Sequence, residues 1–273
     1  MSHWLERARQ RAAMPPRRHR APLYFAAHER LIAVGSLEGA IAARLVDAGL
    51  LHRAGEGYAL ALRSDLDTRV DADAALSAVA RWLHEQGLAS RWRDELLAVE
   101  SADGRTLAHV ERAVVRVLGI GTRAVHLIGC DADGKVWVQQ RAFDKAVDPG
   151  LWDTLMGGQV AAGESVGQTL ERETLEEAGL HVGQLLDLTP CDPITVARPV
   201  AEGYMLERID VFRAVVATGN SPANLDGEVE QFACLDPAAL SVRLEQGEFT
   251  LEATLILGAE LERRIRRTAT RRS

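Results

Sequence analysis

Residues 157–180 constrain the fold more than any other stretch of the chain, because they combine a glycine corner with a well-specified helix. Ser165 and Gln168 have the spacing of a capping box at a helix start, and Gly179 can end the helix in a left-handed conformation. Residues that recur along one side form the inward face, namely Leu170, Thr174 and Ala178. The charged side of the helix is therefore presented by a rigid element.

The charged side of this helix gathers acidic residues. Glu173, Glu176 and Glu177 fall within five residues, and at about 100° of rotation per residue they share roughly a quarter-turn arc. Like charges three or four residues apart destabilise a helix by about 0.2–0.5 kcal/mol per pair. A divalent cation removes that cost, and carboxylate oxygens suit Mg²⁺ or Mn²⁺. For an isolated pair of glutamates a solvated surface is the usual interpretation, so the spacing of the whole stretch decides.

That spacing resembles the signature of the Nudix hydrolase family at every fixed position, with Thr174 standing where a bulky aliphatic residue is usual. The resemblance implies that the Gly157 carbonyl and the three helix carboxylates hold the metals. It also implies that Gly158, Glu164 and Arg172 brace the loop and the helix. The matching pattern reads Gly158-x5-Glu164-x7-Arg172-Glu173-Thr174-x-Glu176-Glu177-x-Gly179-Leu180.

Segments outside the signature are similar to a narrower Nudix group, in which an extra N-terminal domain precedes the hydrolase. Characterised members of that group act on thiamine diphosphate and its oxo and oxy analogues. This chain has Asp153-Thr154 where the group has an Asp-Asn pair, and Met156 where the group has alanine, which leaves the preferred diphosphate open. The matching segments are Trp92-Arg93-Asp94-Glu95, Glu111-Arg112-Ala113, Gly119-Ile120-Gly121-Thr122, Val125-His126-Leu127, Trp137-Val138, Pro149-Gly150 and Asp226-Gly227-Glu228-Val229-Glu230-Gln231-Phe232.

The predicted reaction is metal-dependent hydrolysis of a small organic diphosphate, in which water attacks one phosphorus atom. Many Nudix enzymes add a carboxylate from a later loop as ligand or general base, and Glu228 is preferred over Glu230 because it follows a glycine at a strand entrance. Arg141 and Lys145 are candidates for binding the substrate phosphates, with solvent-facing charges as the alternative. His126 lies in an apolar strand and is expected to be a satisfied core histidine.

The order of the expected elements predicts a mixed α+β fold. Strands before and after the signature helix, and a long helix over 250–267, suggest a mixed sheet between helical layers. The Nudix resemblance implies the same architecture, an α/β/α sandwich with a mixed sheet. We expect a small α+β N-terminal domain to precede it.

The expected boundaries divide the chain into three parts. Residues 1–20 form a basic flexible tail, 21–120 the N-terminal α+β domain, and 121–273 the Nudix hydrolase domain. Within the N-terminal domain, Ser36 is expected to cap a helix, and residues 110–118 are expected to form a short one.

Composition excludes some classes of function. The formal net charge of −7 argues against a general nucleic-acid binder, although bound cations still permit a small anionic substrate. The chain has no apolar run of membrane-spanning length and no signal-peptide pattern, and its three cysteines are sparse, as in a reducing compartment. We therefore expect a cytoplasmic protein with a small-molecule diphosphate as its partner. A homodimer is one of the assemblies left open.

Other functions stay open at this point. A nucleoside-diphosphate derivative such as ADP-ribose could be the substrate, or the fold could be a non-catalytic ligand sensor, which degraded carboxylates would have favoured. Residues 148–154 also resemble the isopentenyl-diphosphate isomerases of the same family. Those enzymes need a catalytic cysteine in a cysteine- and histidine-rich segment, and Cys130, Cys191 and Cys234 lack that setting.

Overall fold

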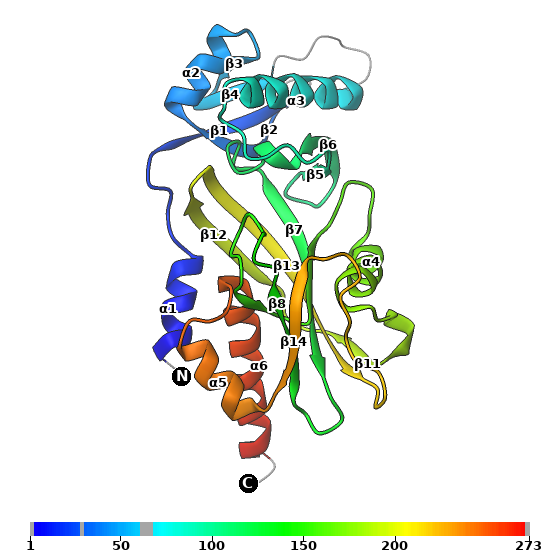
Figure 1. The fold of residues 1–273 in the computed structure, drawn as a ribbon. Helices are drawn as coiled ribbons and strands as arrows, with labels where there is room; N and C mark the ends of the chain where they lie inside the picture. Colours follow the sequence, from blue (N-terminus) through cyan, green and yellow to red (C-terminus); the bar gives the residue numbers. More distant parts are fainter. Residues whose placement is uncertain (1–2, 28–29, 61–67, 271–273) are drawn as a thin grey trace.

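The computed structural model describes residues 3–27, 30–60 and 68–270. Figure 1 shows a smaller unit above a larger one, and the chain returns from the smaller unit to the larger one at the start of strand β7 (Gly121–Cys130). Among the helices of the described residues, none is long and apolar enough to cross a membrane.

The upper unit is a four-stranded sheet with two helices and a separate hairpin. Leu23 and Leu60 of the sheet pack with Leu76 and Leu83 of a helix in one core, whose buried members all lie between residues 21 and 120. The sheet has the order β2-β1-β4-β3, and the elements are β1 (Arg20–Ala27), β2 (Arg30–Glu38), α2 (Gly39–Asp47), β3 (Leu51–Ala54), β4 (Gly57–Leu60), α3 (Thr68–Glu85), β5 (Leu96–Glu100), β6 (Thr106–Glu111) and the short 3₁₀ helix η1 (Arg112–Val114).

The lower unit is built on an eight-stranded mixed sheet. Strand β7 pairs in parallel with β13 (Gly203–Val216), and the other strand pairs of this sheet are antiparallel. The main path of the sheet is β11-β13-β7-β8-β14. Its remaining strands are β8 (Val136–Arg141), β9 (Trp152–Asp153), β10 (Met156–Gln159), β11 (Leu185–Pro190), β12 (Ile194–Val200) and β14 (Val229–Leu235).

Helices cover both faces of this sheet, as Figure 1 shows. Helix α4 (Val166–Ala178) lies on one face, over a core that includes Val125 and Leu127 of β7. Residues from α1, α5 and α6 share a second core with alternate β7 residues such as Ala124 and Ile128. The expected mixed α+β architecture, with a sheet between helical layers, is therefore confirmed. The three helices are α1 (His3–Ala12), α5 (Pro237–Glu245) and α6 (Leu251–Thr270).

The expectation of a flexible tail over residues 1–20 is wrong for the segment that forms α1. Trp4 and Leu5 are buried in the core beneath α6, with Ala8 and Ala12 one and two turns further along. The arginines lie on the other side, where Arg9 reaches Glu262 of α6 at 2.9 Å. The basic composition of this segment thus belongs to the outer face of an amphipathic helix.

The expected helix cap at Ser36 is also wrong. Strand β2 continues through Ser36, and α2 begins at Gly39. The backbone N–H of Ser36 donates to the Leu118 carbonyl at 2.8 Å, and its hydroxyl accepts from Nε of Arg20 at 3.0 Å. Tertiary partners therefore take the groups that a cap would have used.

The short helix expected over 110–118 is wrong at its start. Val110 belongs to β6 and faces Leu97 of β5 in an antiparallel pair, and only Arg112–Val114 then form a 3₁₀ turn. A short apolar run fits a buried strand and a helix equally well, so the pairing with β5 decides.

Candidate active site

Helix α4 has the ends that its sequence predicts. The Ser165 hydroxyl accepts from the Gln168 backbone N–H at 3.3 Å, and the Gln168 side chain accepts from the Ser165 N–H at 2.9 Å. Gly179 ends the helix with φ of 62°. The fixed ends set the rotation of the helix and so decide which carboxylates face the sheet.

Arg172 connects the glycine loop to the helix. Its Nε and Nη2 donate to the two oxygens of Glu164 at 2.8 and 2.9 Å, and its Nη1 donates to Glu173 at 2.8 Å and to Glu176 at 3.0 Å. The paired hydrogen bonds with Glu164 raise the pKa of Arg172, and the guanidinium lowers the pKa of Glu164. The guanidinium of Arg172 thus holds three acidic side chains around it.

Glu173 lies directly against the glycine corner. A Cβ atom on Gly158 would be 2.2 Å from the carboxyl carbon of Glu173, so only glycine leaves room for this side chain. The Glu173 side chain is 14% exposed. Burial raises its pKa, although the neighbouring Arg172 opposes the shift.

Glu177 is the buried member of the acidic set. Its Oε2 accepts from Nε2 of Gln139 at 2.8 Å and from the backbone N–H of Gly157 at 3.0 Å. Burial raises the pKa of Glu177 to about 8, the charges of Glu173 and Asp153 add to the shift, and the two hydrogen bonds oppose it. Gln139 is 2% exposed, and sequence reasoning missed it because nothing near it in the chain marks a site.

A second buried polar group lies behind the glycine corner. Nδ1 of His126 is 2.9 Å from the Thr154 hydroxyl, which itself donates to the Met156 carbonyl at 2.8 Å. Because that hydroxyl has one hydrogen, Nδ1 of His126 is the donor between the two. Burial lowers the pKa of His126, so the ring is neutral, as expected of a satisfied core histidine. A Cβ atom on Gly157 would be 2.5 Å from this ring, which fixes the position of the corner.

The loop residues proposed from the sequence meet at the edge of this site. Lys145 forms an ion pair with Glu228, whose side chain is 49% exposed and whose charge adds to the raised pKa of Glu173. Arg141 has different partners: its Nη2 donates to the Val147 carbonyl at 3.1 Å, and its Nη1 lies 3.7 Å from Asp153. Glu230, the alternative to Glu228, is exposed on β14. The structure therefore pairs Lys145 with Glu228 and brings Arg141 close to Asp153.

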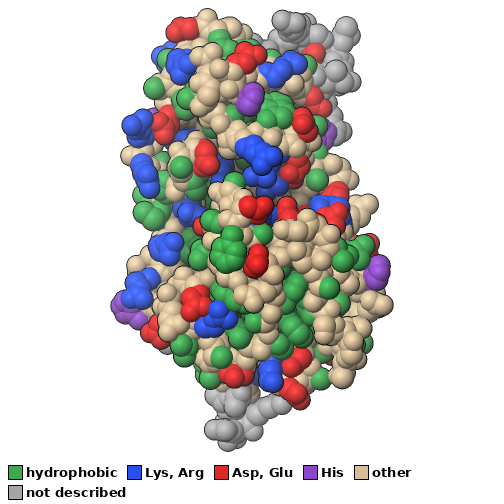
Figure 2. Space-filling model, in the orientation of Figure 1, with side chains coloured by type: hydrophobic (Ala, Val, Ile, Leu, Met, Phe, Trp, Pro, Cys, Tyr) green, Lys and Arg blue, Asp and Glu red, His purple; other side chains and the backbone are tan. Residues whose placement is uncertain are grey.

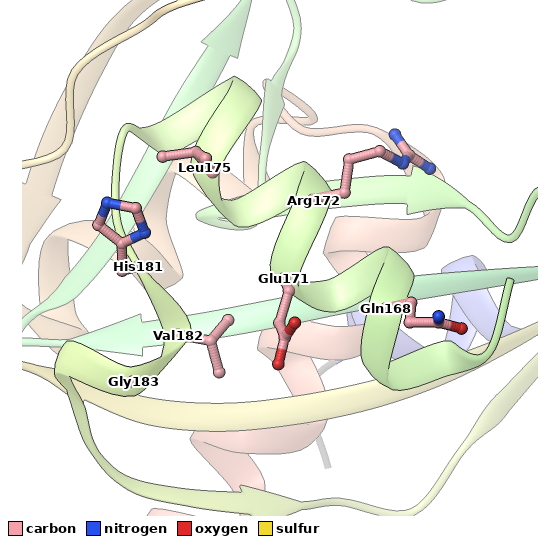
Figure 3. A pocket seen from close by; sticks show the side chains of 7 residues that line it. All are labelled: Gln168, Glu171, Arg172, Leu175, His181, Val182 and Gly183. Atoms are coloured by element: carbon pink, nitrogen blue, oxygen red, sulfur yellow. The ribbon is translucent and has the colours of Figure 1, made fainter.

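A cavity of about 450 Å³ lies on the outer side of α4, against the short 3₁₀ helix η2 (Val182–Gln184). Arg172 is the residue that this cavity shares with the acidic set, and in Figure 3 its side chain extends away from His181. We place the candidate active site at the glycine corner, because the buried carboxylates and their polar partners are there. The cavity is lined by Gln168, Glu171, Arg172, Leu175, His181, Val182 and Gly183.

One family model and several known proteins match the sequence of this chain. A family model described as NUDIX domain matches residues 121–255. Nudix hydrolase 20, chloroplastic, of Arabidopsis thaliana is 30% identical over 209 residues, which cover 71% of this chain and 53% of that protein. An isopentenyl-diphosphate Delta-isomerase of Clavibacter sepedonicus is 31% identical over 150 residues, which cover 54% of this chain and 76% of that protein.

A solved structure shares the fold of the lower unit. The crystal structure of DR0079 from Deinococcus radiodurans superposes with a TM-score of 0.50 at 19% identity, covering 60% of this chain and 98% of that one. This chain spans about half the length of the first curated relatives that it matches.

Proposed function

Because the chain belongs to the Nudix family, we propose that it is a metal-dependent hydrolase that cleaves the diphosphate linkage of a small organic diphosphate. The observation that carries the proposal is a pair of carboxylates, the buried Glu177 and the half-buried Glu173, that α4 holds against the glycine corner. Acidic groups with raised pKa values, gathered around one point, are typical of a functional site rather than of a structural one.

The donor chemistry of the corner fits a divalent cation such as Mg²⁺ or Mn²⁺. Burial disfavours the charged forms of Glu173 and Glu177, and a bound cation would reverse that preference. Within the described ranges, no three acidic, histidine or cysteine side chains are already arranged for coordination, because Arg172 bridges Glu173 and Glu176. The Glu176 side chain is 47% exposed and has room to turn.

Glu173, Glu176, Glu177 and the Gly157 carbonyl would hold the ion. When bound, the cation neutralises phosphate oxygens and lowers the pKa of water at the phosphorus. In this proposal, Arg172 and Glu164 keep the loop and the helix in register while the carboxylates change partners.

The loop residues supply the proton acceptor and phosphate contacts. Glu228 accepts a proton from the attacking water, and Lys145 forms an ion pair with it at the edge of the site. Lys145 and Arg141 are the candidate phosphate ligands from this side of the site. Arg141 also fixes the loop through the Val147 carbonyl.

For the substrate we propose thiamine diphosphate or its oxo and oxy analogues, with ADP-ribose-like compounds as the alternative. The support is the resemblance of segments over 92–232, which continue into the N-terminal domain. In the pair Asp153-Thr154, Thr154 is the residue that differs from that group. Its hydroxyl is hydrogen-bonded to His126 beside the glycine corner. If this difference alters which diphosphate is preferred, it does so next to the glycine corner.

The similarity to an isopentenyl-diphosphate isomerase favours that reaction as a second candidate. The cysteines of this chain argue against it. Burial raises the pKa of the Cys130 thiol and also raises that of Cys234 to about 11, so neither thiol is activated. Cys130 contacts Arg264, and Cys234 contacts Asp131, away from the acidic set.

A substrate panel tests these proposals directly. Phosphate and monophosphate release is measured with Mg²⁺ and Mn²⁺ for thiamine diphosphate, its oxo and oxy forms, ADP-ribose and dinucleotides, and isopentenyl diphosphate is assayed for isomerisation. We expect hydrolysis of at least one diphosphate, and a loss of nearly all turnover in Glu176→Gln with an unchanged circular dichroism spectrum. Ligand binding without turnover across the panel would contradict the hydrolase and favour a sensor.

A further inference from the structure

The N-terminal domain contacts the glycine loop of the candidate active site. The backbone N–H of Ala162, between the glycine corner and Glu164, donates to the Leu96 carbonyl at the start of β5 at 2.8 Å. Residues 91–95 directly precede β5, so this bond places them beside the loop that carries the signature. This segment and the acidic set come from different domains, yet they lie at one junction.

The backbone around Arg93 is held by several independent bonds. Glu111, which is 4% exposed, accepts from the Arg93 backbone N–H at 3.0 Å and from the Ala113 N–H at 3.3 Å. Asp94 adopts φ of 56° and accepts from the Trp92 indole N–H at 2.7 Å. Because few residues other than glycine adopt such a backbone conformation without support, the loop is built to keep a particular shape. That shape leaves the Arg93 side chain exposed.

The guanidinium of Arg93 is a positive charge that forms no ion pair with the acidic residues that the structure describes. Nη1 of the neighbouring Arg112 pairs with Glu95 at 2.7 Å, whereas no ion pair within 4.0 Å is formed by Arg93 in the described part of the chain. Partial burial lowers the pKa of Arg93, Arg112 lowers it further, and the charges of Glu95 and Glu228 oppose the shift. Glu228 is already paired with Lys145. The segment before β5, which contacts the glycine loop through Leu96, thus carries an exposed positive charge.

Figure 2 shows how charged side chains are distributed over one face of the molecule. Basic side chains gather across the middle of the face shown, where the upper unit meets the lower one, and acidic side chains lie just below them. A phosphate group bound by carboxylate-held cations has further oxygens to satisfy, and arginine meets them with two parallel hydrogen bonds.

We propose that Arg93 of the N-terminal domain is a substrate-binding residue that takes a phosphate group of the diphosphate bound at the glycine corner. The domain thereby completes the substrate site, and Arg91 beside it adds to the attraction for an anion. The proposal rests on the diphosphate hydrolase function for its choice of ligand. It rests on the anchored loop and the exposed guanidinium for its choice of residue.

Binding of methylenediphosphonate, a non-hydrolysable diphosphate analogue, tests the proposal on the full-length chain. Isothermal titration calorimetry in Mg²⁺ compares wild type with Arg93→Gln, Arg93→Lys and the control Arg81→Gln, an exposed arginine of α3 in the same domain. We expect Arg93→Gln to weaken binding about tenfold or more, because a hydrogen bond to a charged group is lost. Arg93→Lys should fall between Arg93→Gln and wild type, and the control should match wild type.

The outcomes separate this proposal from the hydrolase itself. An unchanged dissociation constant in Arg93→Gln, or no binding of the analogue by wild type, overturns the role of Arg93. If wild type binds the analogue through Arg93 but hydrolyses no diphosphate, the binding site stands and the hydrolase proposal falls. For an active enzyme, Arg93→Gln should raise KM for the best substrate more than it lowers kcat. Matching thermal unfolding curves exclude a general loss of structure.

Discussion

At the scale of single residues, the least expected feature is the amide that holds Glu177. Gln139 comes from β8, contacts Glu177 on α4, and is buried together with it. Its Oε1 has no hydrogen-bond partner among the described residues. A buried amide with one donor committed to a carboxylate orients that carboxylate, since rotating it would leave the donor unpaired as well.

Replacing Gln139 with methionine should therefore weaken both metal binding and turnover. Loss of a residue that orients a metal ligand typically lowers affinity or activity about 10- to 100-fold. Mn²⁺ affinity is measured from the electron paramagnetic resonance signal of the free ion, with kcat measured in parallel. Gln140→Met is the matched control, because Gln140 bonds to the Gly150 carbonyl rather than to the acidic set. Equal Mn²⁺ affinity in both variants would show that Gln139 does not orient Glu177 for metal binding.

The raised pKa of Glu177 predicts how stability depends on pH. The pKa of Glu177 is about 8 in the folded protein, above the usual value for glutamate. Because folding favours the protonated carboxyl, Glu177 contributes its full stability to the folded state at pH values below the pKa of the unfolded chain. That stability is lost as pH rises through 8. Without metal, Glu177→Gln should gain thermal stability over wild type between pH 5 and pH 9, by on the order of a few kcal/mol at the upper end.

Added Mg²⁺ should reverse this order. A cation that binds the charged carboxylates stabilises the wild type and leaves Glu177→Gln nearly unaffected. Glu171→Gln, an exposed residue of the same helix, serves as the control and should follow wild type with and without the ion. A difference between Glu177→Gln and wild type that stays constant with pH would mean that Glu177 is not the titrating group.

At the scale of elements, the C-terminal end of α4 requires glycine at position 179. Gly179 has φ of 62°, and a Cβ atom there would lie 2.7 Å from the Ala223 carbonyl oxygen. Gly179→Ala should lower the free energy of unfolding by about 1–2 kcal/mol for the left-handed backbone alone, with the contact to Ala223 adding to it. Urea unfolding measures the loss. Gly183→Ala is the control, because its Cβ would meet nothing within 4 Å.

The elements also show what sequence can predict here. Helix α4 was predictable because its caps and its inward face lie within a single stretch, and the three glutamates came with it. The strand continuing through Ser36 was not, since Arg20 and Leu118 decide the fate of that residue from distant positions. Gln139 was hidden for the same reason, because its partner Glu177 on α4 is close to it in space but distant in sequence. Local patterns predict elements, and long-range pairs complete the site.

At the scale of the whole molecule, helix α1 and the eight-stranded sheet of the lower unit form one structure. Helix α1 packs on α6, and a Cβ atom on Gly258 of α6 would be 2.6 Å from Leu5, so the two helices approach closely. The bridge between Ala13 and Ala197 continues this contact to β12. Helix α1 thus supports the sheet from the side opposite to α4.

This arrangement predicts that a change at Leu5 acts on stability and not on chemistry. Leu5 is 1% exposed, and Leu5→Ala should lower the free energy of unfolding by about 2–5 kcal/mol, the usual effect of a cavity in a core. Chemical denaturation measures the loss, and Arg7→Ala on the exposed side of α1 should change little. Mn²⁺ affinity below the unfolding transition should stay at the wild-type value, because α4 and α1 lie on opposite faces of the sheet. A weakened Mn²⁺ site in Leu5→Ala would show instead that strain passes through the sheet from one helical layer to the other.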